Sequence, residues 1–353
     1  MPLLARSVQA PLHIHVRRGA VADLGRILSD GRISAGGDVA VVVGPGLGER
    51  VAELIRPSLT TADVFTTTGG TLDAALELVG KLRSRPYDAV VGIGGGTTID
   101  IAKYAANRWG LPMISVATSL ANDGIASPVA SLINDGMKGS YGVHIPFGVI
   151  VDLDFVEGGP DRVNRGGIGD VISNISALAD WELARQVRDE PVDGLAASLA
   201  RMGAEAVLTM PGDMSDDAFV TVLAEALISS GLAMAVCGSS RPASGGCHEI
   251  MHATDTLYPG TGSHGELAGL GALFCTFLRG DERRFAQMSD CLARHQLPRT
   301  PADVGLNDEQ FVEIVGFAPR TRPDRYTILE HLQMTPDETH RKLAQYVEAV
   351  ADR

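Results

Sequence analysis

Three histidines in one short segment, together with one aspartate, could form a metal centre. His248, His252 and His264 lie within seventeen residues, and His248 and His252 are four residues apart, on one face of a predicted helix. With Asp170 they offer one carboxylate and two or three imidazoles, which suit Zn²⁺, Fe²⁺ or Ni²⁺ and leave a position open for a substrate oxygen. The spacing differs from the HExxH pattern of zinc proteases. The alternative is that these histidines are ordinary core or surface residues.

A glycine-rich segment could bind a phosphate group. Residues 91–100, VGIGGGTTID, place Gly94, Gly95 and Gly96 between a predicted strand and a predicted helix. Glycines leave the backbone N–H groups and the positive end of the helix dipole open to the pyrophosphate of a dinucleotide. An ordinary strand-to-helix turn is the alternative. A second turn, residues 44–48, lacks the GxGxxG spacing and is interpreted as structural. No acidic residue ends the strand before it, so the sequence does not separate NAD from NADP.

A polar loop follows the next predicted strand. Residues 119–128 read SLANDGIASP, and doubly wound sheets place ligand contacts in loops at the carboxyl ends of their strands. Thr118, Asp123 and Ser127 are therefore candidates for contacts with a cofactor or a substrate hydroxyl. Capping of the turn is the competing explanation.

A parallel sheet must position these loops. Short β-branched runs alternate with turns and amphipathic stretches over about the first 155 residues, a pattern that predicts βαβ units of the nucleotide-binding kind. An Asn134-Asp135-Gly136 turn between apolar runs predicts a hairpin that leads to a last strand. The four strands predicted before the hairpin are residues 39–43, 63–66, 89–93 and 112–116.

The remainder of the chain is predicted to be helical. From about residue 165, Ala, Leu, Glu and Met recur at helical spacing, broken by Pro and Gly. The predicted fold is a Rossmann-like α/β domain over residues 1–158 and an all-α domain over residues 159–353. The cleft between them is the expected place for an active site.

Composition narrows the class of protein. The 353 residues carry a formal net charge of −13, which disfavours binding to nucleic acids and to anionic membranes. The four cysteines form no CxxC pair and are expected to be reduced. No signal peptide or stretch of about 20 apolar residues is apparent. We therefore expect a cytoplasmic enzyme, and the large helical domain suits a homo-oligomer, a dimer or larger.

Taken together, these segments resemble the metal-dependent sn-glycerol-1-phosphate dehydrogenases, in the superfamily of iron-containing alcohol dehydrogenases, glycerol dehydrogenases and dehydroquinate synthases. The resemblance covers most of the chain. It rests on six segments that occur in the expected order: GIGGGTTIDIAK, NDGIASPVASL, GDVISNISALADWELA, GSSRPASGGCHEIMHA, HGELAGLG and RPDRYTIL.

The resemblance implies a role for each site residue. The metal ligands are Asp170, His248 and His264. The catalytic residues that contact the substrate are Asp123 and His252. The residues that bind NAD or NADP are Gly94, Gly95, Gly96, Thr97, Thr98, Thr118, Ser119, Leu120, Ala121 and Ser127. The implied reaction interconverts dihydroxyacetone phosphate and sn-glycerol 1-phosphate, as in phospholipid metabolism, with one divalent ion, Zn²⁺, Ni²⁺ or Fe²⁺.

Two departures from the family pattern leave the substrate open. Asn122 stands where a histidine is common, and Gly246-Cys247 replaces Ser-Glu before His248. The alternatives are a related dehydrogenase acting on another polyol or keto sugar and, less favoured, a dehydroquinate synthase-like lyase, which the shortage of lysines (four in the chain) argues against. The candidates for binding a substrate phosphate are Lys138, His144 and Arg241.

Overall fold

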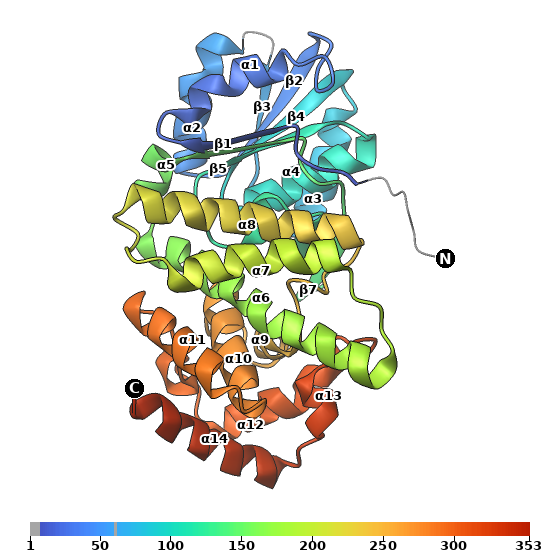
Figure 1. Cartoon of the computed structure of the whole chain (residues 1–353). Helices are drawn as coiled ribbons and strands as arrows, with labels where there is room; N and C mark the ends of the chain where they lie inside the picture. Colours follow the sequence, from blue (N-terminus) through green and yellow to red (C-terminus); the bar gives the residue numbers. More distant parts are fainter. Residues whose placement is uncertain (1–7, 60–61) are drawn as a thin grey trace.

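The computed structural model describes residues 8–59 and 62–353, and it contains a sheet with helices on both faces followed by a helical bundle (Figure 1). This order of an α/β part and an all-helical part confirms the predicted fold class. The first seven residues of the N-terminal stretch, in which no signal peptide is expected, lie outside the described residues.

The main sheet has six parallel strands in the order β1-β8-β5-β4-β2-β3. The predicted strands are all present, and one further strand, β1, precedes them. The sequence HIHVR of β1 escapes prediction because it is only five residues long and carries three charged or polar side chains, as suits a partly exposed edge strand. The bounds are β1 (His13–Arg17), β2 (Asp38–Val43), β3 (Ala62–Thr66), β4 (Tyr87–Gly94), β5 (Met113–Ala117) and β8 (Gly148–Asp152).

Helices cover both faces of this sheet. Val41 of β2 packs in one cluster with Val51, whereas the adjacent Val42 packs in another cluster with Leu78. Strands buried on both faces become continuous apolar runs, which is why the sequence of β2 reads as one. The helices here are α1 (Leu24–Leu28), α2 (Leu47–Ile55), α3 (Leu72–Leu82) and α4 (Gly96–Trp109), with 3₁₀ turns η1 (Ala20–Asp23) and η2 (Arg56–Ser58).

A two-stranded antiparallel hairpin stands apart from the main sheet. It pairs β6 (Val129–Asn134) with β7 (Met137–Gly142). Asp135 and Gly136 between the strands both have positive φ, 49° and 77°, as a type I′ turn requires. The predicted turn is therefore confirmed.

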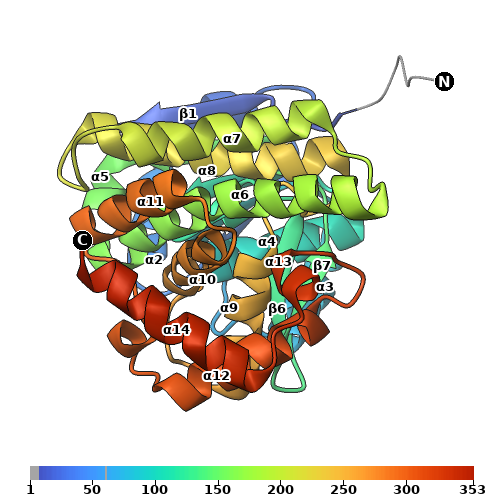
Figure 2. The same ribbon diagram turned by 60° about the horizontal axis from the view of Figure 1, so that its bottom comes forward.

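The helical part begins within a few residues of the end of β8. Figure 2 shows α9 and α10 in its middle, with α6 and α11 on one side and α12 and α14 on the other. Its α-helices are α5 (Leu153–Glu157), α6 (Asp161–Arg188), α7 (Gly194–Thr209), α8 (Asp217–Cys237), α9 (Gly246–Leu257), α10 (His264–Leu278), α11 (Glu282–Arg294), α12 (Asp308–Phe317), α13 (Ile328–Leu332) and α14 (Pro336–Ala351). The 3₁₀ turns of the helical part are η4 (Pro301–Val304) and η5 (Ala318–Thr321), whereas η3 (Asp123–Ile125) lies earlier, in the loop between β5 and β6.

Helices α6 and α10 cross in unusually close contact. A Cβ atom added to Gly265 of α10 would lie 1.8 Å from the carbonyl oxygen of Gly166 in α6, and one added to Gly169 would lie 2.2 Å from the carbonyl oxygen of Gly265. Only glycine fits at these positions, because real Cβ atoms keep at least 3.0 Å from other heavy atoms. The crossing brings the start of α10 against the first third of α6, where Gly166 and Gly169 lie.

One helix among the described residues, α8, is long and apolar enough to span a membrane. Its apolar 18-residue window is 61% buried inside the protein, and side chains such as Phe219, Leu223 and Leu227 belong to the main hydrophobic cluster. Helix α8 is therefore a core helix. All four cysteines lie in the described part of the chain and are free thiols.

Candidate active site and metal centre

A cavity of about 540 Å³ lies where the carboxyl ends of β4 and β5 face the helical part. Its wall on the sheet side includes Gly94 and Ser119, and its wall on the helical side includes His248, His252 and His264. Groups that are far apart in the sequence therefore share one space.

The glycine loop, Gly94 to Gly96, forms one end of this cavity. Gly95 precedes the first residue of α4, so the N–H groups of the first helical turn face the loop. A Cβ atom on Gly94 would lie 2.9 Å from Thr98, and one on Gly95 would lie 3.3 Å from the Ser119 hydroxyl oxygen. The loop thus fits the pyrophosphate of a dinucleotide, which needs open backbone donors at a helix N-terminus. Thr97 and Thr98 also line the cavity.

The earlier glycine turn also reaches the cavity. Gly44 and Pro45 contribute to the wall beside the glycine loop. The structural role inferred for this turn has a physical basis, because a Cβ atom on Gly44 would lie 2.3 Å from the Thr98 hydroxyl and one on Gly48 would lie 2.6 Å from the Ile93 carbonyl oxygen. The turn therefore packs tightly and borders the site at the same time.

The polar loop after β5 is held in place by a buried lysine. Lys103 of α4 is 1% exposed, and its Nζ donates hydrogen bonds to the carbonyl oxygens of Gly124 at 2.8 Å and Ser127 at 3.3 Å. Its carboxylate partner is Asp100, at 2.9 Å. The loop residues that line the cavity are Ser119, Ala121, Asn122, Asp123, Gly124 and Ser127.

Two predicted cofactor residues lie behind this wall. Leu120 is fully buried, and its backbone N–H donates to Asn164 of α6 at 2.9 Å. Thr118 is buried, and its N–H donates to the carbonyl oxygen of Gly94 at 3.1 Å. Neither residue is part of the cavity lining, although both support the residues that are.

The metal triad consists of Asp170 of α6, His248 of α9 and His264 of α10, whose donor atoms all lie within 4.8 Å of one another. Asp170 Oδ1 is 3.2 Å from His264 Nε2 and 3.6 Å from His248 Nε2. One carboxylate oxygen and two imidazole nitrogens around a common point fit a divalent transition metal with open positions toward the cavity.

The packing around the triad fixes the orientation of its members. Ser263 and Glu266 form a capping box at the start of α10, which sets the first turn on which His264 lies. Although burial opposes it, hydrogen bonds from His248 and His264 hold the pKa of Asp170 below its usual range, so its carboxylate is ionised. Burial lowers the pKa of His248, which favours the neutral imidazole that a metal requires.

Asp123 of the polar loop touches the triad. Its backbone N–H donates to Asp170 Oδ2 at 2.9 Å, and its carboxylate accepts a hydrogen bond from Ser230 of α8 at 2.9 Å. Burial, with the nearby charge of Asp170, raises the pKa of the Asp123 carboxyl to about 7. The polar loop is therefore coupled directly to the metal centre.

His252 lies one turn beyond His248 and is not part of the triad. The two rings are 6.4 Å apart between centroids. Its Nε2 accepts a hydrogen bond from Arg322 at 3.1 Å, which leaves Nδ1 to carry the proton of the neutral ring. Burial and the Arg322 guanidinium hold the pKa of His252 well below its usual range. Sequence reasoning assigned no role to Arg322, although it begins the RPDRYTIL segment.

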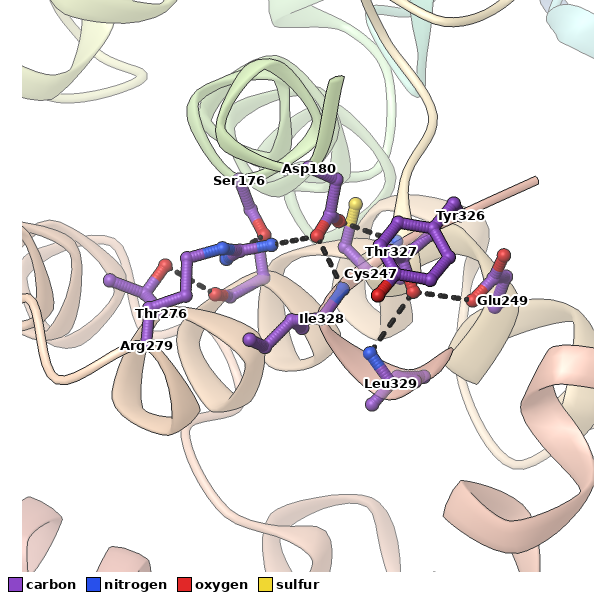
Figure 3. Close-up of polar contacts among 12 residues, drawn as sticks. Ser176, Asp180, Cys247, Glu249, Thr276, Arg279, Tyr326, Thr327, Ile328 and Leu329 are labelled. Carbon is purple, nitrogen blue, oxygen red and sulfur yellow. Dashed lines mark hydrogen bonds and ion pairs between the residues drawn. The ribbon is translucent and has the colours of Figure 1, made fainter. Parts of the chain in front are cut away.

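A buried polar network anchors α9, and sequence reasoning also missed it. Figure 3 shows Asp180 of α6 between the guanidinium of Arg279 and two backbone N–H groups. Those N–H groups belong to Gly246, the first residue of α9, and to Ile328, and each lies 2.8 Å from the carboxylate. Asp180 is fully buried. It therefore fixes the start of the helix that carries His248.

The departures from the family pattern also have defined positions. Asn122 lines the cavity, whereas Cys247 is fully buried and burial raises the pKa of its thiol to about 12. Its sulfur lies 3.4 Å from His248 Nδ1, the nitrogen turned away from the triad. Cys247 is therefore a packed thiol beside a metal ligand, and not a ligand itself.

Of the three candidates for a substrate phosphate, one lines the cavity. Lys138 of β7 does so. Arg241 is buried and its guanidinium pairs with Glu190. His144 is exposed, with its ring 3.2 Å from Gln9.

Comparison with known proteins agrees with this geometry. The profile of the family described as iron-containing alcohol dehydrogenase matches residues 15–160. A relative from Methanosarcina mazei, named glycerol-1-phosphate dehydrogenase (NAD(P)+), is 34% identical over 92% of both chains. One of the same name from Hyperthermus butylicus is 36% identical over 93% of this chain and 95% of its own.

Solved structures show the same fold. A probable glycerol dehydrogenase from Sinorhizobium meliloti superposes with a TM-score of 0.79 over 99% of this chain and all of its own, at 21% identity. Glycerol dehydrogenase from Schizosaccharomyces pombe gives 0.77 over 99% and 92% of the two chains, at 20% identity. At these identities the structures inform on architecture alone.

Proposed function

Because this chain belongs to the family of glycerol-1-phosphate dehydrogenases, within the iron-containing alcohol dehydrogenases, we propose that it interconverts dihydroxyacetone phosphate and sn-glycerol 1-phosphate with NAD(P). Membership confirms the resemblance carried by the sequence motifs. The observation that carries the proposal is that His248 and His264 of the metal triad line the same cavity as the glycine loop.

The cofactor residues would act mainly through the backbone. The glycine loop and the first turn of α4 would hold the pyrophosphate, with hydroxyls of Thr97, Thr98, Ser119 and Ser127 and the backbone of Ala121 nearby. Thr118 and Leu120 would support this wall from behind. Since β2 ends in Val43 with no acidic residue before the turn that borders the cavity, we propose that both NAD and NADP are accepted.

The triad would hold one divalent ion, and we propose Zn²⁺ or Ni²⁺, with Fe²⁺ as the alternative. When bound, the ion supplies a Lewis acid for the substrate oxygen and the nicotinamide exchanges the hydride. Asp170 supplies the negative charge that lowers the net charge of the centre.

Asp123 and His252 would position the substrate between these groups. Both line the cavity next to the triad. The Asp123 carboxylate, steadied by Ser230, would accept a hydrogen bond from the substrate hydroxyl. His252, held neutral by its surroundings, would serve as a hydrogen-bond donor that orients the reacting carbon.

One observation favours a second candidate, a dehydrogenase of another polyol or keto sugar. Asn122, where the family pattern often has histidine, lines the cavity, so this departure could change substrate choice.

A dehydroquinate synthase-like lyase is disfavoured, because Lys103 is engaged by the polar loop and Lys81 pairs with Glu77 on the surface. Lys138 is the lysine that the cavity contains.

One assay separates these activities. The purified protein, stripped and reloaded with Zn²⁺ or Ni²⁺, would be mixed with NADH or NADPH and with either dihydroxyacetone phosphate or dihydroxyacetone. Oxidation of the coenzyme with the phosphate ester supports the main proposal, and oxidation with the free ketone alone supports the second candidate. No oxidation with either ketone and either metal would refute both.

We also propose a cytoplasmic homo-oligomer that serves phospholipid metabolism. The buried position of the apolar helix α8 supports a protein that stays in aqueous surroundings. Leu195 and Met202 on α7 are 50% and 65% exposed, and apolar surface of this kind suits contact with a second copy. Sedimentation analysis would give the oligomeric state.

A further inference from the structure

Two cationic side chains and a hydroxyl meet at the cavity end beside His252. Lys138 and Ser140 lie on β7, and Arg322 follows η5. All three line the cavity that His248 and His264 of the metal triad also line. Figure 2 shows the segment before α13 next to β7, so the hairpin and this late segment of the chain face each other here.

Arg322 is the centre of this group. Its Nη2 lies 3.3 Å from the Ser140 hydroxyl and 3.1 Å from His252 Nε2. These partners are 182 and 70 residues away in the sequence, so the group exists only in the folded protein. Ser140 is uncharged and His252 is neutral, so neither partner offsets the positive charge of the Arg322 guanidinium.

The guanidinium of Arg322 has hydrogen-bond donors and a positive charge that the protein leaves without a partner. Its Nε is buried without a hydrogen-bond acceptor, and no carboxylate pairs with it among the described residues. Three other guanidiniums of the helical part pair with carboxylates, Arg241 with Glu190, Arg279 with Asp180 and Arg284 with Glu205, and Arg325 donates to the Ser244 carbonyl oxygen and the Ser240 hydroxyl. A buried donor without an acceptor is costly unless a ligand completes it.

Lys138 adds a second positive charge. Its Nζ is 3.3 Å from Asp255, and both side chains are partly exposed, 36% and 22%, so this surface pair is weak. The lysine can turn toward the cavity at little energetic cost. Two cations and a hydroxyl match the charge and the oxygen atoms of a phosphate monoester, which the planar donors of arginine bind in pairs.

We infer that Arg322, Lys138 and Ser140 form the subsite that binds the phosphate group of the substrate. This inference rests on the proposed function and names the part of the site that selects a phosphorylated triose over the free ketone. The position of Arg322 is consistent with this role, since His252 lies between Arg322 and the metal ligand His248 on the same wall of the cavity. The glycine loop serves the coenzyme at the other end of the cavity.

Selectivity for the phosphorylated ketone follows from the unpaired Nε donor of Arg322. With a phosphate in place, the buried Nε and the remaining N–H groups of Arg322 gain acceptors. With dihydroxyacetone they stay unpaired, and a site built around polar groups discriminates strongly against an analogue that lacks the matching group. The ratio of kcat/KM values for the two ketones therefore reports on the subsite.

The test uses the metal-loaded enzyme and the variants Arg322→Met and Lys138→Met. We expect the preference for dihydroxyacetone phosphate over dihydroxyacetone to fall about 100-fold in the first and about 10-fold in the second. Arg322→Lys should recover part of the loss. The control is Arg320→Met, whose guanidinium lies 5.8 Å above the Phe317 ring and not at the cavity, and which should keep the preference of the unaltered enzyme.

Binding of inorganic phosphate, followed by isothermal titration calorimetry, is a readout independent of turnover. The unaltered enzyme should bind phosphate and Arg322→Met should not. If Arg322→Met lowers kcat/KM equally for both ketones and still binds phosphate, Arg322 acts only through His252 and the subsite is refuted. Lys138, which does not touch His252, tests the same idea if Arg322→Met fails to fold. An unaltered enzyme that binds phosphate but does not reduce dihydroxyacetone phosphate would refute the proposed function and leave the subsite standing.

Discussion

Replacing Gly265 with alanine should release the metal. The added Cβ atom would lie 1.8 Å from the carbonyl oxygen of Gly166, whereas real Cβ atoms keep at least 3.0 Å, so α6 and α10 must separate by about 1.2 Å. His264 precedes Gly265, and its Nε2 lies 3.2 Å from Asp170 Oδ1 on the opposite helix. Metal–ligand distances tolerate changes of only about 0.2 Å, so the two ligands can no longer reach one ion.

The expected loss is large for the metal and moderate for the fold. Affinity for the divalent ion should fall at least about 100-fold, since misplaced supporting groups alone cost about 10- to 100-fold. Overpacking should lower the free energy of unfolding by about 3 kcal/mol. Coenzyme binding should change little, because the glycine loop lies on the other wall of the cavity.

Metal content after gel filtration, measured by mass spectrometry, and competition with a chelator give the affinity. Gly316→Ala is the matched control, since no atom lies within 4 Å of its added Cβ in α12, and it should keep the metal and gain about 0.5 kcal/mol. If Gly265→Ala retained one ion with unaltered affinity, the crossing would not be what aligns the triad.

Three further predictions concern the metal site, the buried Asp180–Arg279 pair and the buried His295. His264→Ala should lose the metal, whereas His252→Ala should keep it and lose turnover; full metal retention by the first variant, measured by mass spectrometry, would refute the ligand assignment. Asp180→Asn should lower the free energy of unfolding in denaturant titrations by about 3 kcal/mol, because the buried guanidinium of Arg279 loses its counter-charge, and an unchanged midpoint would contradict this. Burial lowers the pKa of His295 to about 4, below the 6.5 of the unfolded chain, so the unfolded chain binds more protons between these values and stability is lost as pH falls from 6.5 to 4. In His295→Gln the free energy of unfolding should fall by about 1 to 2 kcal/mol less over this pH range. A plot of melting temperature against pH should therefore be flatter for the variant than for the unaltered protein.

Most of the fold could be predicted from the sequence because the strands of the main sheet are buried on both faces. Runs such as that of β2 are apolar throughout, and helical spacing dominates after residue 165. Strand β1 has neither signature, because an edge strand mixes polar and apolar positions.

The parts of the site that lie in recognisable motifs could be predicted from the sequence. The parts whose role depends on which side chains pair in the folded protein could not. The triad lies in segments that resemble known motifs. Arg322 is one of 26 arginines and begins the RPDRYTIL segment, and only the folded chain shows that no carboxylate of the described residues pairs with it, whereas Arg241, inside the GSSRPASGGCHEIMHA segment, is paired with Glu190. A motif therefore marks a basic residue without showing whether its charge is already neutralised.

The two walls of the cavity come from different parts of the fold, the sheet for the glycine loop and α6, α9 and α10 for the triad. Coenzyme preference and metal binding are therefore set by different groups, and the polar loop after β5 joins them, since the backbone N–H of Asp123 donates to Asp170. The turn after β2 packs against Thr98 and not against the triad, so exchanges in this turn should alter coenzyme preference while the ion stays in place.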